Sequence, residues 1–105
     1  MLYLTKDTPI RLAIAPVDFR KQIDGLAAFC RNKLLQDPSS GALFVFINKR
    51  QTMIRILCYD KNGFWLATKR LSRGRYKTWP KDSRQACHPA MAAQLTSILR
   101  NMVAS

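Results

Sequence analysis

The chain has 105 residues, of which 48% are hydrophobic, and its 18 lysines and arginines against six acids give a net charge of +12. This length predicts a single domain over residues 1–105, with a core of about residues 3–80 and a C-terminal helix of about residues 89–103. It argues against a multidomain enzyme, and no apolar run is long enough to predict a membrane span or a signal peptide. Three cysteines without a CxxC pair fit the reducing cytoplasm.

The first predicted elements are a strand and a long helix. The run Ile10–Ala15 predicts a short strand that Pro16 ends. Asp18 is the predicted N-cap of an amphipathic helix, because apolar residues recur at helical spacing from there to about Leu35. Residues 37–41 then predict a turn.

Three strand-like runs follow, joined by links short enough for antiparallel hairpins. They are Ala42–Ile47, Met53–Tyr59 and Phe64–Leu71, and a further short strand is predicted over Arg75–Trp79. Residues 81–88 are predicted to be a loop, and Pro89 suits the first turn of a last helix with the apolar stripe Met91, Leu95, Ile98 and Met102. The predicted fold class is α+β, with a mainly antiparallel sheet of four to five strands, one long helix packed on one face and a C-terminal helix.

Strand pairing predicts which side chains face the long helix. If Tyr59 lies opposite Phe64, one face carries Ile54, Ile56, Cys58, Trp65 and Ala67, and a matching first hairpin adds Phe44 and Phe46. We expect this face to pack against Leu26, Cys30 and Leu34. The other face would carry Val45, Arg55, Leu57, Tyr59, Phe64, Leu66, Thr68 and Arg70. Either it is an open contact surface, or the C-terminal helix covers its apolar half.

The acids do not form a catalytic pattern. Metal-dependent nuclease and strand-transfer sites need clustered carboxylates, whereas this chain has no Glu and scatters Asp7, Asp18, Asp24, Asp37, Asp60 and Asp82. The single histidine, His88, adjoins Cys87, and adjacent residues rarely bind one tetrahedral metal. The sequence therefore predicts no enzyme activity, no metal site and no cofactor.

Positive charge is concentrated in one part of the chain. Eleven of the 18 cations lie between Lys49 and Arg84, interleaved with aromatic residues. A solvated strand edge protected from aggregation needs only a few lysines, so this density favours contact with a polyanion. The predicted nucleic-acid-binding residues are Arg55, Lys69, Arg70, Arg73, Arg75, Tyr76, Lys77 and Trp79, with Tyr76 or Trp79 stacking on bases.

Three blocks of the sequence resemble one known family. They are residues 15–28, 37–46 and 63–80. They are similar to the Orf2-like accessory proteins, often labelled TnpB, of the bacterial insertion sequence group numbered sixty-six. Positions that match the family's motifs are Arg20, Lys21, Asp24, Gly25, Lys69, Arg70, Arg73, Gly74 and Arg75. The resemblance implies a protein encoded beside a separate transposase that carries the catalytic carboxylates, and it implies no catalytic residue in this chain.

These observations give a primary hypothesis and an alternative. The primary hypothesis is a non-catalytic, nucleic-acid-binding accessory protein of insertion-sequence transposition, with DNA and a transposase as partners. The alternative is a protein-interaction adaptor that docks the transposase without direct DNA contact. A salt titration separates them, because phosphate contacts weaken steeply with salt and apolar docking does not.

Overall fold

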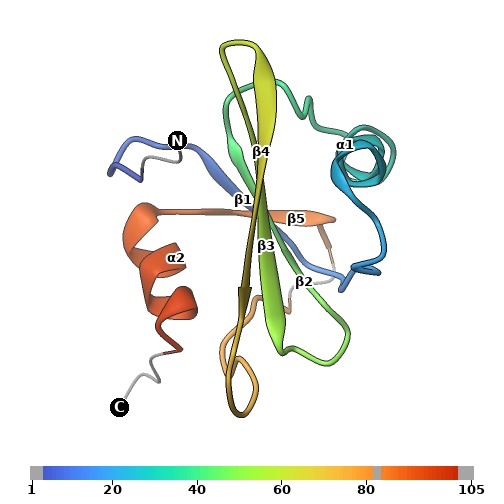
Figure 1. The fold of residues 1–105 in the computed structure, drawn as a ribbon. Coiled ribbons are helices and arrows are strands. Elements are labelled where there is room, and N and C mark those ends of the chain that lie inside the picture. The colour runs from blue at the N-terminus through green and yellow to red at the C-terminus, as the bar shows by residue number, and fades with distance from the viewer. Residues whose placement is uncertain (1–3, 82–83, 102–105) are drawn as a thin grey trace.

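The computed structural model describes residues 4–81 and 84–101. Its elements, in chain order, are β1 (Ile10–Ala13), α1 (Ile23–Asn32), β2 (Leu43–Ile47), β3 (Met53–Asp60), β4 (Gly63–Arg70), β5 (Cys87–Ala90) and α2 (Ala92–Leu99). The strands form one five-stranded sheet in the order β4-β3-β2-β1-β5. Figure 1 shows α1 and α2 on opposite sides of this sheet. The α+β class is confirmed. No helix within the described ranges is long and apolar enough to cross a membrane.

The sheet is mixed rather than purely antiparallel. Strand β1 pairs with β2 in parallel, with Ile10 opposite Leu43, while the other neighbouring strands are antiparallel. A parallel pair needs a crossover connection, and here that connection contains α1. The prediction of a mainly antiparallel sheet missed this unit because it treated the helix as a layer and not as a link.

The first helix is shorter than predicted at both ends. Asp18 is not its N-cap, because its carboxylate accepts the backbone N–H of Arg20 at 2.9 Å and binds the Arg20 guanidinium, which forms a separate turn. The helix begins five residues later, at Ile23. At the other end Leu35 adopts a left-handed φ of 56° and the chain leaves the helical path.

The C-terminal part of the sequence prediction was wrong in two places. Residues 75–79 form no strand, and a strand forms instead at β5, within the segment predicted as loop and helix start. Pro89 lies in β5 opposite Arg11. Because β5 is an outer strand, the missing N–H of proline is tolerated there. Helix α2 therefore begins only at Ala92, and Met102 of the predicted stripe lies outside the described residues.

Both faces of the sheet are buried against a helix. On the α1 side, Phe44 and Phe46 pack in one cluster with Leu26, Cys30 and Leu34, which confirms that part of the predicted core. On the α2 side the cluster consists of Ile10, Leu12, Leu43, Val45, Ile47, Ile54, Cys58, Tyr76, Trp79, Leu95 and Ile98. The predicted second face is not covered by the C-terminal helix: its residues Leu57, Phe64 and Leu66 pack on the α1 side, and only Val45 of that face lies on the α2 side.

The predicted register of the first hairpin was wrong by one residue. Tyr59 does lie opposite Phe64. Phe44, however, lies opposite Leu57, which is not on the face that carries Ile54 and Ile56. A one-residue shift moves every side chain of a strand to the other face. Ile54 and Ile56 therefore pack on the α2 side, and Trp65, predicted to be buried, is 46% exposed.

A buried asparagine explains this register. The backbone N–H of Asn48 donates to the carbonyl of Met53, so the connecting loop is the four residues between them. The Asn48 side-chain oxygen accepts the N–H groups of Thr52 and Met53 at 2.9 and 3.0 Å. The asparagine is only 8% exposed, and these bonds close the loop from inside.

Candidate nucleic-acid interface

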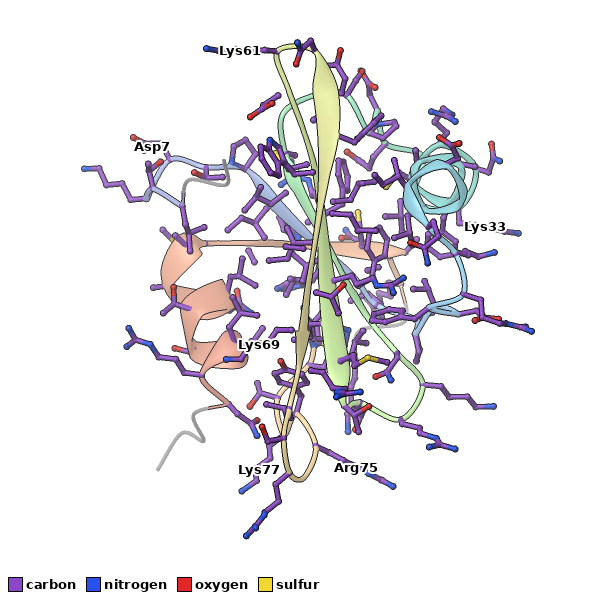
Figure 2. The ribbon with its side chains drawn as sticks, viewed as in Figure 1. Asp7, Lys33, Lys61, Lys69, Arg75 and Lys77 are labelled. Carbon is purple, nitrogen blue, oxygen red and sulfur yellow. The ribbon has the colours of Figure 1, made fainter. Side chains whose placement is uncertain are left out.

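Two basic loops meet at one end of the sheet. The loop between β2 and β3 accepts two hydrogen bonds from the segment after β4, namely Leu71 N–H to the Thr52 carbonyl and Tyr76 N–H to the Gln51 carbonyl. These bonds bring two groups of exposed cations to the same end of the molecule. We call this surface the basic end, and its cations are Lys49, Arg50, Arg70, Arg73, Arg75 and Lys77. Figure 2 shows Arg75 and Lys77 extending from this end, far from Lys61 in the β3–β4 turn.

The conformation of residues 70–80 depends on two buried aromatic anchors. Tyr76 is 2% exposed and Trp79 is 9% exposed, and both belong to the core on the α2 side. The indole Nε1–H of Trp79 donates to the Ala13 carbonyl at 3.0 Å. Because the two rings face inward, the cations before and between them, Arg75 and Lys77, face the solvent.

The predicted stacking role of Tyr76 and Trp79 is therefore wrong. A ring stacks on a base only if its face is accessible, and these faces are covered by the protein core. Burial also raises the pKa of the Tyr76 hydroxyl. Aromatic residues and cations alternate along this segment because its aromatic side chains are buried in the core and its cations face the solvent. This alternation, which suggested a stacking surface, is therefore that of a segment anchored to the core.

Two further predicted contact residues bind other parts of the chain. Arg55 donates from Nη1 to the carbonyls of Phe19 and Lys21 at 2.7 and 2.8 Å, and its guanidinium lies 4.8 Å from the Phe19 ring centroid. Lys69 donates from Nζ to the Leu99 carbonyl at 2.6 Å, at the C-terminal end of α2. Both side chains hold elements together, and neither forms part of the basic end.

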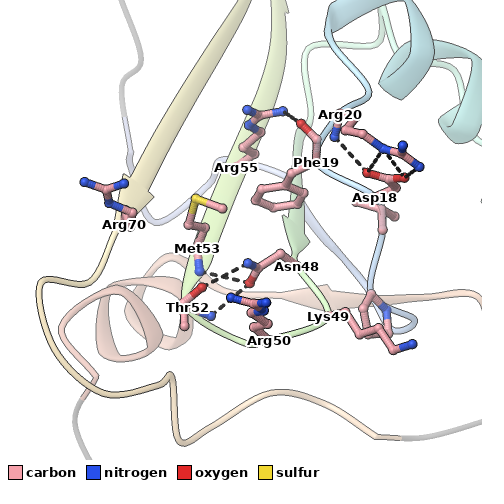
Figure 3. A pocket seen from close by; sticks show the side chains of 12 residues that line it. Asp18, Phe19, Arg20, Asn48, Lys49, Arg50, Thr52, Met53, Arg55 and Arg70 are labelled. Atoms are coloured by element: carbon pink, nitrogen blue, oxygen red, sulfur yellow. Dashed lines mark hydrogen bonds and ion pairs between the residues drawn. The ribbon is translucent and has the colours of Figure 1, made fainter.

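A hollow of about 880 Å³ adjoins the basic end (Figure 3). It lies between the loop before α1, the β2–β3 loop and the neighbouring ends of β3 and β4. Its lining includes five cations, Arg20, Lys49, Arg50, Arg55 and Arg70, against one acid, Asp18. The Arg20 side chain lowers the pKa of the Asp18 carboxyl to about 2, and the two form an ion pair at 2.6 Å. Their charges cancel, so the remaining cations set the charge of the hollow.

Sequence reasoning missed Lys49 and Arg50. They lie in a hairpin loop, far along the chain from the basic segment at residues 69–77. The signal was present, since two adjacent cations in a short loop must be exposed. What the sequence did not show is that this loop and the segment after β4 are hydrogen-bonded neighbours.

Residues 4–81 and 84–101 contain no group of three or more His, Cys, Asp or Glu side chains placed to hold a metal ion. Burial raises the pKa of the Cys30 thiol to about 12, so this sulfur stays protonated and unreactive at neutral pH. His88 lies on β5 opposite Leu12, inside the sheet ladder.

Comparison with known proteins identifies the class. Residues 8–103 match the model of the family described as IS66 Orf2 like protein. This match spans nearly the whole chain, and the protein therefore belongs to that family of insertion-sequence accessory proteins. The resemblance seen in the three sequence blocks is thereby confirmed.

Two relatives come from Sinorhizobium fredii. The chain is 42% identical over 67 residues to the uncharacterized protein y4jC, a match that covers 64% of this chain and 57% of that protein. It is 31% identical over 99 residues to the uncharacterized protein y4hO, covering 92% of this chain and 85% of the relative. The chain thus spans little more than half the length of y4jC. No solved structure matches the chain.

Proposed function

We propose that this protein is a non-catalytic accessory factor of insertion-sequence transposition that binds DNA through its basic end. In this proposal residues 1–105 form a single domain that acts in the cytoplasm beside a separate transposase. The observation that supports DNA binding most directly is the joining of two cationic loops at one end of the sheet. None of the acids at positions 7, 18, 24, 37 and 60 lies within residues 48–53 or 70–77. Cations gathered in this way match the charge density of a phosphate backbone.

The availability of the arginines supports the same proposal. Arg70, Arg73 and Arg75 are exposed, and within residues 4–81 and 84–101 no ion pair or hydrogen bond engages their guanidinium groups. An arginine side chain that is not engaged within the protein can donate two N–H groups to one phosphate. Such contacts fix a protein on DNA without reading its sequence.

The test is a salt titration of DNA binding. We expect Arg70→Ala, Arg73→Ala and Arg75→Ala together to leave the fold intact, because all three side chains are exposed. The variant should bind all duplex sequences more weakly, and the slope of log affinity against log salt should shrink by about 0.9 per lost contact, up to roughly 2.7. Fluorescence anisotropy with element-end and unrelated duplexes measures both quantities.

The matched control removes cations away from the basic end. Lys33 follows α1 and Lys61 lies in the β3–β4 turn, and both side chains are exposed. The control combines Lys33→Ala with Lys61→Ala. This double variant should keep the wild-type salt slope. If the triple variant also keeps the wild-type affinity and slope, DNA contact at the basic end is refuted, and the protein-adaptor function replaces it.

A further inference from the structure

The hollow beside the basic end has two kinds of lining. Cations on the β2–β3 loop and at the end of β4 lie around it, while Pro16, Phe19 and Met53 give it apolar surface. In the view of Figure 3, the Phe19 ring and the Met53 side chain lie between Arg70 on one side and Lys49 on the other. A site of this kind suits an anion that also carries an apolar, flat part.

An unpaired nucleotide has this combination of charge and ring. The phosphates of an intact duplex meet cations, but its bases stay stacked inside the helix and cannot reach an apolar surface. A base in a single-stranded tail exposes both ring faces and carries its own phosphate. A volume of about 880 Å³ is sufficient for one nucleotide, since small-molecule sites span roughly 300–1,000 Å³.

The Phe19 ring is fixed before any ligand binds. Arg55 binds the carbonyls of Phe19 and Lys21 and lies against the ring, and its Nε donates to Thr68 at 3.1 Å. This clamp joins the loop before α1 to strands β3 and β4. A ring held in place costs less entropy to stack on than a mobile one.

We propose that this hollow binds one unpaired nucleotide of a DNA strand, with its base against Phe19 and Met53 and the phosphates on its two sides at Arg70 and at Lys49 and Arg50. The proposal rests on the proposed function, because the tail arrives with a duplex bound at the basic end. Lys49, Arg50 and Arg70 belong to both surfaces. The phosphates of a DNA strand that lies along the basic end can therefore stay in contact with cations as the strand enters the hollow.

The experiment compares three labelled DNAs of the same duplex sequence. One has blunt ends, one carries a short single-stranded tail, and one carries a tail of the same length without bases. We expect wild-type protein to bind the tail with bases about fivefold or more tighter than the abasic tail, because stacking requires the base and both tails carry the same phosphates.

Variants locate this preference in the hollow. Met53→Ser and Phe19→Leu should each abolish the difference between the two tails while blunt-duplex affinity stays unchanged. The control is Leu35→Ser, since Leu35 is 79% exposed and lies outside the hollow. This variant should keep the difference. If neither hollow variant folds, a photoreactive base in the tail should crosslink wild-type protein at the peptides that contain Phe19 or Met53.

The outcomes separate the two proposals. Equal affinity for both tails, or crosslinks that lie elsewhere, would overturn the nucleotide site and leave duplex binding intact. Failure to bind any of the three DNAs would overturn the proposed function itself. An acidic aromatic peptide that displaces the tail at lower concentration than a free oligonucleotide would assign the hollow to a protein partner instead.

Discussion

Trp79 shows how one residue was assigned to the wrong environment. In the sequence it follows a run of cations, which is typical of a stacking surface. In the structure its indole donates to the Ala13 carbonyl and its ring packs in the core on the α2 side. It joins the segment after β4 to β1, from which it is separated by most of the chain.

A substitution at Trp79 should therefore affect stability and not DNA contact. Trp79→Phe removes the indole N–H that donates to the buried carbonyl of Ala13, which costs about 1–3 kcal/mol of unfolding free energy. Trp79→Ala also removes the ring and should cost about 3–5 kcal/mol. Urea denaturation measures both changes.

The DNA measurement on the same variant is the decisive comparison. The folded fraction of Trp79→Phe should bind single-stranded DNA like wild type. A selective loss of single-strand affinity with unchanged stability would show that the ring acts at a nucleic-acid surface after all.

At the level of elements, the β2–β3 loop connects fold and site. Asn48 closes this loop from inside and presents Lys49 and Arg50 on its outer side. The side-chain oxygen accepts two backbone N–H groups, and Nδ2 donates to Thr52 at 3.0 Å. The position of two proposed phosphate-binding cations thus depends on one buried amide.

We expect Asn48→Ala to destabilise the protein by about 1–3 kcal/mol, because it leaves two N–H groups without an acceptor. Asn48→Asp keeps the acceptor oxygens and should recover most of this loss. Thermal and urea unfolding measure the stabilities, which should fall in the order wild type, Asn48→Asp, Asn48→Ala. Equal stability of the two variants would show that the acceptor bonds do not hold the loop.

The elements differ in how far the sequence determines them. Three strands, β2, β3 and β4, were predicted within one residue at each end because their apolar and β-branched runs have clear boundaries. Strand β5 has the sequence Cys-His-Pro-Ala, which carries no strand signal. It is a strand because it pairs with β1, whose backbone groups on that side would otherwise be unpaired. The helix α1 lost its first turns because Asp18 binds Arg20, a local contact that periodicity does not reveal.

The candidate site was predictable only in its charge. The sequence located the cations at residues 69–77, and the structure shows Arg70, Arg73, Arg75 and Lys77 exposed. It did not predict the pairing of this segment with the β2–β3 loop, which is a tertiary contact. It also assigned Arg55 to a nucleic-acid partner, although the guanidinium is used to clamp the loop before α1.

For the whole molecule, the acids within residues 4–81 and 84–101 do not form the shared cluster that a nuclease site requires. Asp18 pairs with Arg20, Asp37 accepts bonds from Ser39, and Asp60 accepts from the Trp65 indole. Each of these three carboxylates is engaged in its own turn or ion pair. A two-metal mechanism needs carboxylates that share an ion.

We therefore expect no cleavage or strand joining by this chain alone with magnesium or manganese. Supercoiled plasmid and labelled element-end duplex, incubated with each metal, are analysed for nicks and joined products. Specific nicking that Asp24→Asn or Asp60→Asn abolishes would contradict this expectation. Nicking that survives both substitutions points to a contaminating nuclease.

The position of β1 has a consequence for how the protein is made. β1 leaves the ribosome before one of its neighbours, β5, and before the helix α2 that covers its face. A product truncated after residue 80 would keep the α1 side of the sheet. It would lose Leu95 and Ile98 from the cluster around Ile10, Leu12 and Val45, and the apolar surface exposed in this way would make such a chain a substrate for chaperones and proteases.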